Sequence, residues 1–281
     1  MLNLRNIVRF VVSMVYGLTF VQSIYSLMEH CGKPIALPPF LYVVFVSFCG
    51  IMIFIVSGFW LEGYLVTKAT IFVKSLGMVI QINRGNILNE DGVVVVGVND
   101  FFDTLVDDHH ISPKSLQGKV IKEYWGGNIC DLDAQLAYGL KGVKYEVVAR
   151  DGKAKERRFQ IGTSVMVKSS CGKRFLFVAL SKTNAITNRT HSSLQDLSTA
   201  VRGALAVARE EANGDDVSFP LMGRGNSRIK APEQVLFYKL LTTIMAECLE
   251  NEKVANQVNV VLCKGALKQL NMFALEKEWD V

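Results

Sequence analysis

The sequence predicts an α/β protein in which a pair of apolar helices precedes a domain with a sheet covered by helices on both faces. Three observations favour this class. Two apolar runs of membrane-spanning length lie in the first part of the chain, and the second ends near Trp60. A run of four valines begins at Val93. Short strand patterns then alternate with amphipathic helix patterns, which is typical of a three-layer α/β/α arrangement.

Each apolar run is long enough to cross a bilayer. The first covers Ile7 to Met28 and the second covers Phe40 to Leu61, and about 20 helical residues span the ~30 Å of hydrocarbon. A signal peptide explains the first run poorly, because the run is too long for an h-region and a second span follows closely. Two buried helices of a soluble core are the other alternative. We expect residues 1–66 to form a two-helix transmembrane hairpin.

Basic residues around the two runs predict their orientation. Arg5 and Arg9 flank the first run, and Lys68 and Lys74 follow the second, whereas the connector carries one lysine beside one glutamate. The positive-inside rule therefore predicts an inner-membrane protein with both termini in the cytoplasm. Polar residues inside the first run, such as Gln22, would favour self-association by hydrogen-bonding between helices, or would bond their own backbone.

Composition excludes some classes of function. The formal charge of +5 suits an anionic partner such as phosphate or a lipid surface, but the chain has no block of Lys and Arg and no nucleic-acid-binding motif. The six cysteines form no Cys-x-x-Cys pair. We therefore expect free thiols in a reducing compartment, no metal site and no nucleic-acid partner.

Residues 67–281 read as one domain of alternating strands and helices. The expected strands are 70–74, 78–83, 93–96, 145–150, 157–163, 175–180, 217–219 and 258–262. The expected helices are 131–140, 193–212, 232–250 and 265–279. Asp151-Gly152 suits the tight turn of a hairpin between two of these strands.

The strand that begins at Val93 runs into a long polar loop. A short β-branched run indicates a buried central strand, and ligands of α/β sheets bind at the carboxyl ends of strands. Hydroxyl, ammonium and backbone donors in this loop suit an anion. The two phenylalanines are candidates to stack on a base, with core packing as the alternative, and His109-His110 is interpreted as a solvated loop. The candidate binding residues are Asn99, Asp100, Phe101, Phe102, Asp103, Ser112, Lys114, Ser115 and Gly118.

A second loop follows the strand predicted at 217–219. Glycines there would let backbone N–H groups approach a phosphate closely, and an arginine would add bidentate charge. The helix that begins near Pro232 would add its positive end, while a plain turn is the alternative explanation. The candidate binding residues are Leu221, Met222, Gly223, Arg224, Gly225, Asn226 and Ser227. We expect the two loops to form the walls of one anion-binding cleft.

The order of these parts resembles the macro domain. The resemblance rests on Gly85-Asn86-Ile87, the valine strand ending in VGVND, and the later FPLMGRG, and it covers about Ile71 to the C-terminus. In that family the matching elements bind ADP-ribose and related nucleotides, so the resemblance adds Asn86 and Ile87 to the candidate site. It also implies a macro-like three-layer α/β/α fold with a mixed sheet for residues 67–281.

Two spans followed by a macro domain with GVNDFFDT and ISPKSLQGK resemble the membrane-anchored macro effector of Thoeris antiphage defence systems. The resemblance implies that the chain binds a nucleotide messenger made from NAD by a TIR-domain partner. In the two-span type this messenger is histidine-conjugated ADP-ribose. It further implies that binding drives homo-oligomerisation and membrane damage that kills the infected cell.

The chain departs from the macro hydrolases in its first loop. Those enzymes show an Asn-Ala-Ala-Asn run followed by three glycines, whereas this chain has Gly97-Val98-Asn99-Asp100 and no triplet. Asn86 also replaces the usual aspartate of the adenine turn. We therefore expect binding without catalysis, and no cofactor besides the ADP-ribose derivative as ligand. The alternatives are a membrane-tethered ADP-ribosyl hydrolase and a membrane-anchored scaffold with an empty site.

Overall fold

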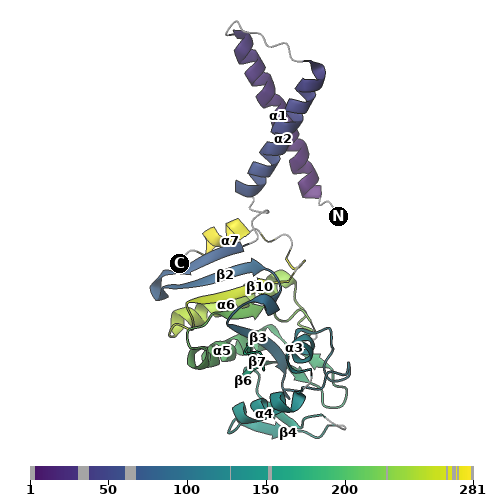
Figure 1. The fold of residues 1–281 in the computed structure, drawn as a ribbon, viewed down its shortest axis with the longest axis vertical. Helices are drawn as coiled ribbons and strands as arrows, with labels where there is room; N and C mark the ends of the chain where they lie inside the picture. Colours follow the sequence, from purple (N-terminus) through teal and green to yellow (C-terminus); the bar gives the residue numbers. More distant parts are fainter. Residues whose placement is uncertain are drawn as a thin grey trace. The chain divides into compact units, whose positions relative to one another are not determined.

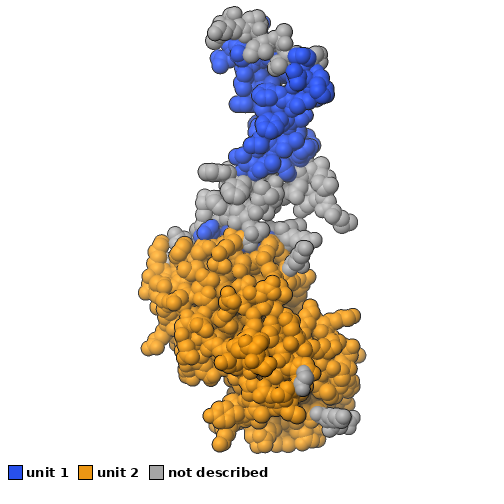
Figure 2. Space-filling model, viewed as in Figure 1, with its two compact units in different colours: residues 1–67, 269–278 blue, residues 68–268, 279–281 orange. Residues whose placement is uncertain are grey.

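The structure is a computed structural model that describes residues 4–30, 38–60, 68–126, 128–150, 154–225, 227–263, 265–267, 270 and 272–279. The chain divides into two compact units, residues 1–67 with 269–278 and residues 68–268 with 279–281 (Figure 2). The first unit contains helices α1 (Leu4–His30), α2 (Pro39–Trp60) and α7 (Met272–Glu278). The second contains the remaining elements and both predicted loops.

Helices α1 and α2 pack against each other as an antiparallel-type pair of long apolar helices (Figure 1). The rings of Phe10 and Phe54 meet edge to face with centroids 5.6 Å apart, and most other apolar side chains of both helices are exposed. By length and composition, Phe10–His30 and Phe40–Ser57 are able to cross a membrane. Thr19 donates a hydrogen bond to its own helix backbone at Tyr16, 2.9 Å away, as expected for a hydroxyl inside an apolar helix.

The second unit is built on a mixed sheet. Its strands follow the order β1 (Lys68–Val73), β2 (Met78–Arg84), β10 (Gln257–Leu262), β9 (Val217–Pro220), β3 (Val93–Asn99), β7 (Arg174–Thr183) and β6 (Ser164–Lys168). The neighbours from β2 to β7 pair in parallel, while β1, β6 and the short β8 (Thr190–His191) pair antiparallel at the edges. The carboxyl ends of the parallel strands therefore meet at one edge of the sheet.

Helices cover both faces of the sheet (Figure 1). Alternate valines of β3, namely Val94, Val96 and Val98, share a core with Trp125 and Leu132, which lie on α3 (Leu116–Trp125) and α4 (Ile129–Gly139). Helix α5 (Leu194–Glu211) packs on β6 and β7 from the opposite side, and α6 (Glu233–Glu250) packs on α5. A two-stranded hairpin of β4 (Tyr145–Val147) and β5 (Arg157–Phe159), and the short 3-10 helices η1 (Lys74–Leu76) and η2 (Ile87–Asn89), complete the unit. The predicted three-layer α/β/α fold with a mixed sheet is confirmed.

Some local predictions were incomplete. The last helix begins at Met272 instead of residue 265, and the sequence patterns did not predict α3 or β6. Helix α3 is only ten residues long and begins inside the polar loop, so its apolar periodicity is short. The predicted turn at Asp151-Gly152 lies outside the described residues.

Candidate functional site

A cleft of about 600 Å³ lies where β3 and β9 end, and residues of both predicted loops line it. This is the edge of a parallel sheet at which ligands bind in α/β folds. The turn between β7 and β8 contributes a third wall, with Asn188 and Arg189. The predicted residues that line the cleft are Asn99, Ser112, Lys114, Ser115, Leu221, Met222, Gly223, Gly225 and Ser227.

The second loop shapes its wall with backbone. Gly223 has φ +92°, and a Cβ at this position would lie 2.7 Å from the Cδ1 atom of Ile229, so only glycine fits without strain. Gly225 differs, because a Cβ there would have no neighbour within 4 Å. At Gly223 the main chain itself therefore forms the wall of the cleft, whereas at Gly225 there is room for a side chain. Asn226, also predicted for the site, lies outside the described residues.

The arginine predicted to supply charge points elsewhere. Arg224 forms an ion pair with Glu233, with 2.6 Å between Nε and Oε1, and donates a hydrogen bond to the Sγ atom of Cys263 at 3.6 Å. It is absent from the cleft lining, where Arg228 stands instead. Glu233 lies in the first turn of helix α6, and its ion pair holds Arg224 outside the cleft lining.

The first loop presents the beginning of helix α3 to the cleft. The Ser115 hydroxyl caps the helix: it accepts a hydrogen bond from the Gly118 N–H at 3.0 Å and donates to the Ser112 carbonyl at 2.6 Å. Gly118 is needed for packing, since a Cβ there would collide with that same carbonyl, and it does not line the cleft. Lys114 and the N-terminus of α3 are the positive features that this loop leaves for an anion.

Both phenylalanines lie in the protein core and not in the cleft. Phe101 is 1% exposed and Phe102 is fully buried. The guanidinium of Arg150 lies 4.0 Å from the centre of the Phe101 ring, and Phe102 meets Phe159 edge to face at 5.6 Å. The packing alternative considered from the sequence is therefore the one observed, and base stacking by these rings is not supported.

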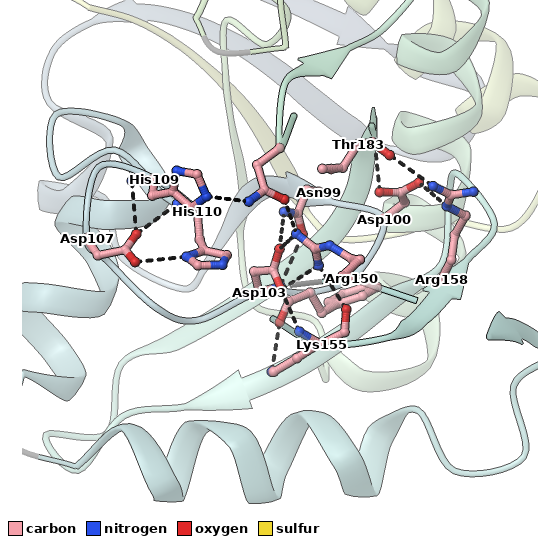
Figure 3. Close-up of polar contacts among 12 residues, drawn as sticks. Asn99, Asp100, Asp103, Asp107, His109, His110, Arg150, Lys155, Arg158 and Thr183 are labelled. Carbon is pink, nitrogen blue, oxygen red and sulfur yellow. Dashed lines mark hydrogen bonds and ion pairs between the residues drawn. The ribbon is translucent and has the colours of Figure 1, made fainter. Parts of the chain in front are cut away.

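Two aspartates of the first loop are each paired with an arginine (Figure 3). Asp103 and Arg150 form a two-pronged ion pair with N–O distances of 3.1 and 2.9 Å. Asp100 pairs with Arg158 at 3.2 Å and accepts a hydrogen bond from the Thr183 N–H at 3.0 Å. Burial raises the pKa of Asp100 above its ordinary value, and this outweighs the lowering by Thr183 and Arg158. Asp100 borders a second cavity, of about 1120 Å³, instead of the cleft.

Asn99 connects the cleft to this ion-pair network (Figure 3). Its Nδ2 donates to the Asp103 Oδ2 at 2.8 Å, and its Oδ1 accepts from the Asp103 N–H at 3.1 Å. The side chain is 5% exposed but still lines the cleft. Asp103 thus holds the amide of Asn99 in one orientation without lining the cleft itself.

Two histidines that the sequence analysis interpreted as a solvated loop lie at the cleft. His109 and His110 both line the cleft, and the side chain of His110 is only 9% exposed, so its interpretation as solvated was wrong. Asp107 holds both residues by accepting their backbone N–H groups, and its Oδ2 lies 2.8 Å from the His110 Nδ1. Burial raises the pKa of Asp107, but the hydrogen bonds lower it by more, so the pKa of Asp107 lies below its ordinary value. The signal available in the sequence was the aspartate placed two residues before His109, a pattern typical of an Asx-turn.

Asn86 and Ile87 are not brought to the cleft. Asn86 caps η2 by accepting a hydrogen bond from the Leu88 N–H at 3.2 Å, and Ile87 is buried in the core. Among the residues that the structure describes, no group of three His, Cys, Asp or Glu side chains is placed to hold a metal ion. The described cysteines, which exclude Cys31, are all free thiols.

The layered sheet and the cleft at its carboxyl edge define a macro-type α/β/α domain. Residues 80–263 match the family described as Thoeris protein ThsA, Macro domain. The match covers more than half of the chain, and the chain belongs to this family.

Individual proteins show more distant similarity. The Thoeris protein ThsA of Bacillus amyloliquefaciens (strain Y2) is 26% identical over 208 residues, which cover 72% of this chain and 68% of that protein. A mutant Oceanobacillus iheyensis macrodomain with ADPR is 15% identical, with a TM-score of 0.45, over 75% of this chain and 97% of that chain. The Trypanosoma brucei macrodomain in complex with ADP-ribose is 12% identical, with a TM-score of 0.44, over 71% of this chain and 68% of that chain.

Proposed function

We propose that the protein is a Thoeris antiphage effector whose macro domain, residues 67–281, binds an ADP-ribose-type messenger made by a TIR-domain partner. The observation that carries this proposal is the cleft within the family-matched region. It combines the glycine loop at Gly223, the N-terminus of α3, and the cations Lys114, Arg189 and Arg228. Exposed backbone, a helix N-terminus and basic side chains are the features that bind a diphosphate.

The two aspartates that were predicted for the site, Asp100 and Asp103, support binding without turnover; Asp108, which also lines the cleft, is exposed and is not one of them. A carboxylate that activates water must be free to take up a proton. Asp103 is neutralised by the buried Arg150, and Asp100 is paired with Arg158 and faces the second cavity. Neither group is available in the cleft as a general base.

In this proposal the N-terminal helices damage the membrane when the ligand is bound. Helices α1 and α2 would span the inner membrane with both termini in the cytoplasm, and their exposed apolar side chains would contact lipid. Two helices alone cannot enclose an aqueous path, because their outer faces must stay apolar. Several copies must therefore gather, and the ligand drives this only by binding the assembled state more tightly.

The binding step is tested by calorimetric titration of the full-length protein in lipid nanodiscs with ADP-ribose. We expect saturable binding, and we expect Lys114→Glu to weaken it at least tenfold, because the variant places a negative charge in the cleft. Lys119→Glu is the matched control, since Lys119 is exposed on helix α3, which follows Lys114, and does not line the cleft. Absence of binding by the unmodified protein would refute the proposal.

Chromatography of the same mixtures shows whether the ligand is consumed, and so distinguishes the effector hypothesis from the hypothesis of a membrane-tethered hydrolase. Intact ligand after prolonged incubation is expected from a binding module. In cells that make the messenger, deletion of Met1–Gly63 should abolish dye entry and cell death while ligand binding persists. Death caused by the truncated protein, or consumption of an ADP-ribose derivative in the mixtures, would favour the hydrolase.

A further inference from the structure

Arg150 is an arginine held almost completely out of water next to the cleft. Its side chain is 1% exposed and that of its partner Asp103 is 3% exposed. Besides the two bonds to Asp103, it donates to the Lys155 carbonyl at 2.8 Å and lies against the Phe101 ring. The guanidinium is thus held by Asp103, Lys155 and Phe101, and Figure 3 shows it beside Asp103.

One of those groups reaches the turn between β7 and β8. The Nη2 atom of Arg150 lies 2.9 Å from the Oδ1 atom of Asn188. A guanidinium only donates hydrogen bonds, so Asn188 must turn its carbonyl oxygen toward Arg150. The amide nitrogen of Asn188 then faces the other way, where it lies 2.9 Å from the Nε2 atom of His109.

The amide nitrogen of Asn188 also only donates. The Nε2 atom of His109 must therefore accept, which requires a neutral ring with its proton on Nδ1. A free imidazole in water favours the opposite arrangement, with the proton on Nε2. Which ring nitrogen carries the proton is set by the hydrogen bond that the ring makes, and here that bond is set by Arg150 through Asn188.

We infer that Arg150 is a positioning residue that sets the proton pattern of the cleft. Through Asn188 it makes His109 a donor at Nδ1. Through Asp103 it fixes Asn99, whose Oδ1 and one Nδ2 hydrogen are used internally, so that a single N–H remains for a ligand. Asn99, His109 and Asn188 all line the cleft. Given the proposed function, this wall offers N–H donors to acceptor oxygens such as those of a phosphate or a ribose.

Nitrogen NMR of the full-length protein in nanodiscs, with only histidine labelled by ¹⁵N, tests the assignment directly. The chain has four histidines, and His109→Gln identifies the signal. We expect the His109 ring to carry its proton on Nδ1. A ring protonated on Nε2 in the unmodified protein would overturn the inference.

Two variants test the role of Arg150. Arg150→Met removes the guanidinium and should return His109 to the Nε2-protonated form. Asn188→Asp keeps an oxygen for Arg150 but offers His109 only an acceptor, so Nε2 must become protonated while the fold is retained. Arg157→Met is the control, because Arg157 is exposed on the same hairpin and lies 4.8 Å from the Tyr145 ring centre. An unchanged His109 signal in folded Asn188→Asp would contradict the relay.

Binding provides a second readout. ADP-ribose affinity should fall about tenfold in Arg150→Met, which is the ~1.4 kcal/mol of one decade, and should stay within about twofold in Arg157→Met. Unchanged affinity in Arg150→Met, with the His109 proton moved, would overturn the role in binding. If the unmodified protein shows the Nδ1-protonated ring but binds no ADP-ribose, the proposed ligand is wrong while the relay stands.

Discussion

The two walls of the cleft are held in different ways. The wall that follows β3 depends on side chains: the buried Asp103–Arg150 pair fixes Asn99, and Asp107 fixes two histidines. The wall that follows β9 depends on main chain, with Gly223 at φ +92° where no side chain fits. The wall that follows β3 should therefore lose its structure when a charged side chain is removed. The wall that follows β9 should lose its structure when a side-chain atom is added.

The largest effect is expected from Asp103→Ala. Removal of one partner leaves Arg150 buried and unpaired, which costs about 3–5 kcal/mol of unfolding free energy. Asp215→Ala is the matched control, because Asp215 also pairs with an arginine, Arg174, but is 58% exposed, and exposed pairs contribute about 0–1 kcal/mol. Denaturant titration measures both. Equal losses in the two variants would remove the distinction between the buried pair and the surface pair.

A smaller loss is expected from Gly223→Ala. Positive φ at a residue with a Cβ costs about 1–3 kcal/mol, and Ile229 must also move. Gly225→Ala, on the same loop, should change the unfolding free energy by no more than about 0.5 kcal/mol, because its Cβ enters open space. The same denaturant titrations compare the pair, and a neutral Gly223→Ala variant would mean that the loop relaxes freely.

Gly225→Glu should separate binding from stability. The open space accepts the side chain without a clash, but the carboxylate repels a diphosphate, so ADP-ribose affinity should fall at least tenfold, about 1.4 kcal/mol. Gly225→Gln has nearly the same size without the charge and should lose less. Calorimetry measures both affinities. Equal behaviour of the two variants would show that charge at this wall has no influence.

The smallest effect concerns pH. The pKa of Asp100 is raised by burial, so the folded protein holds this proton at pH values where the unfolded chain has lost it. The contribution of Asp100 to stability therefore declines as pH rises from the ordinary aspartate range through the raised value. Asp100→Asn should remove that decline. The measurement is the unfolding free energy of both proteins as a function of pH. The same decline with pH in Asp100→Asn as in the unmodified protein would contradict the expectation.

Sequence patterns predicted the framework better than the site. Uniform valines identified β3, and helix α5 followed from its apolar face and from Asn213-Gly214 at its end, since these signals are local. Arg150 carried no such signal, because its importance arises only when a distant hairpin brings it to Asp103. The prediction that Arg224 binds an anion was wrong for the same reason, because its pairing with Glu233 depends on how the loop folds. Side-chain pairing between segments is a property of the folded chain.

The order of strands also has a consequence in time. Strand β10 lies between β2 and β9 and pairs in parallel with both, yet it is translated after both of them. At ~5–20 residues per second, about ten seconds or more separate translation of β2 and β10. Until β10 enters, β2 and β9 have no common neighbour and the edge that carries the cleft is incomplete. A nascent chain therefore cannot complete this edge of the sheet, or the proposed binding site beside it, before β10 has been translated.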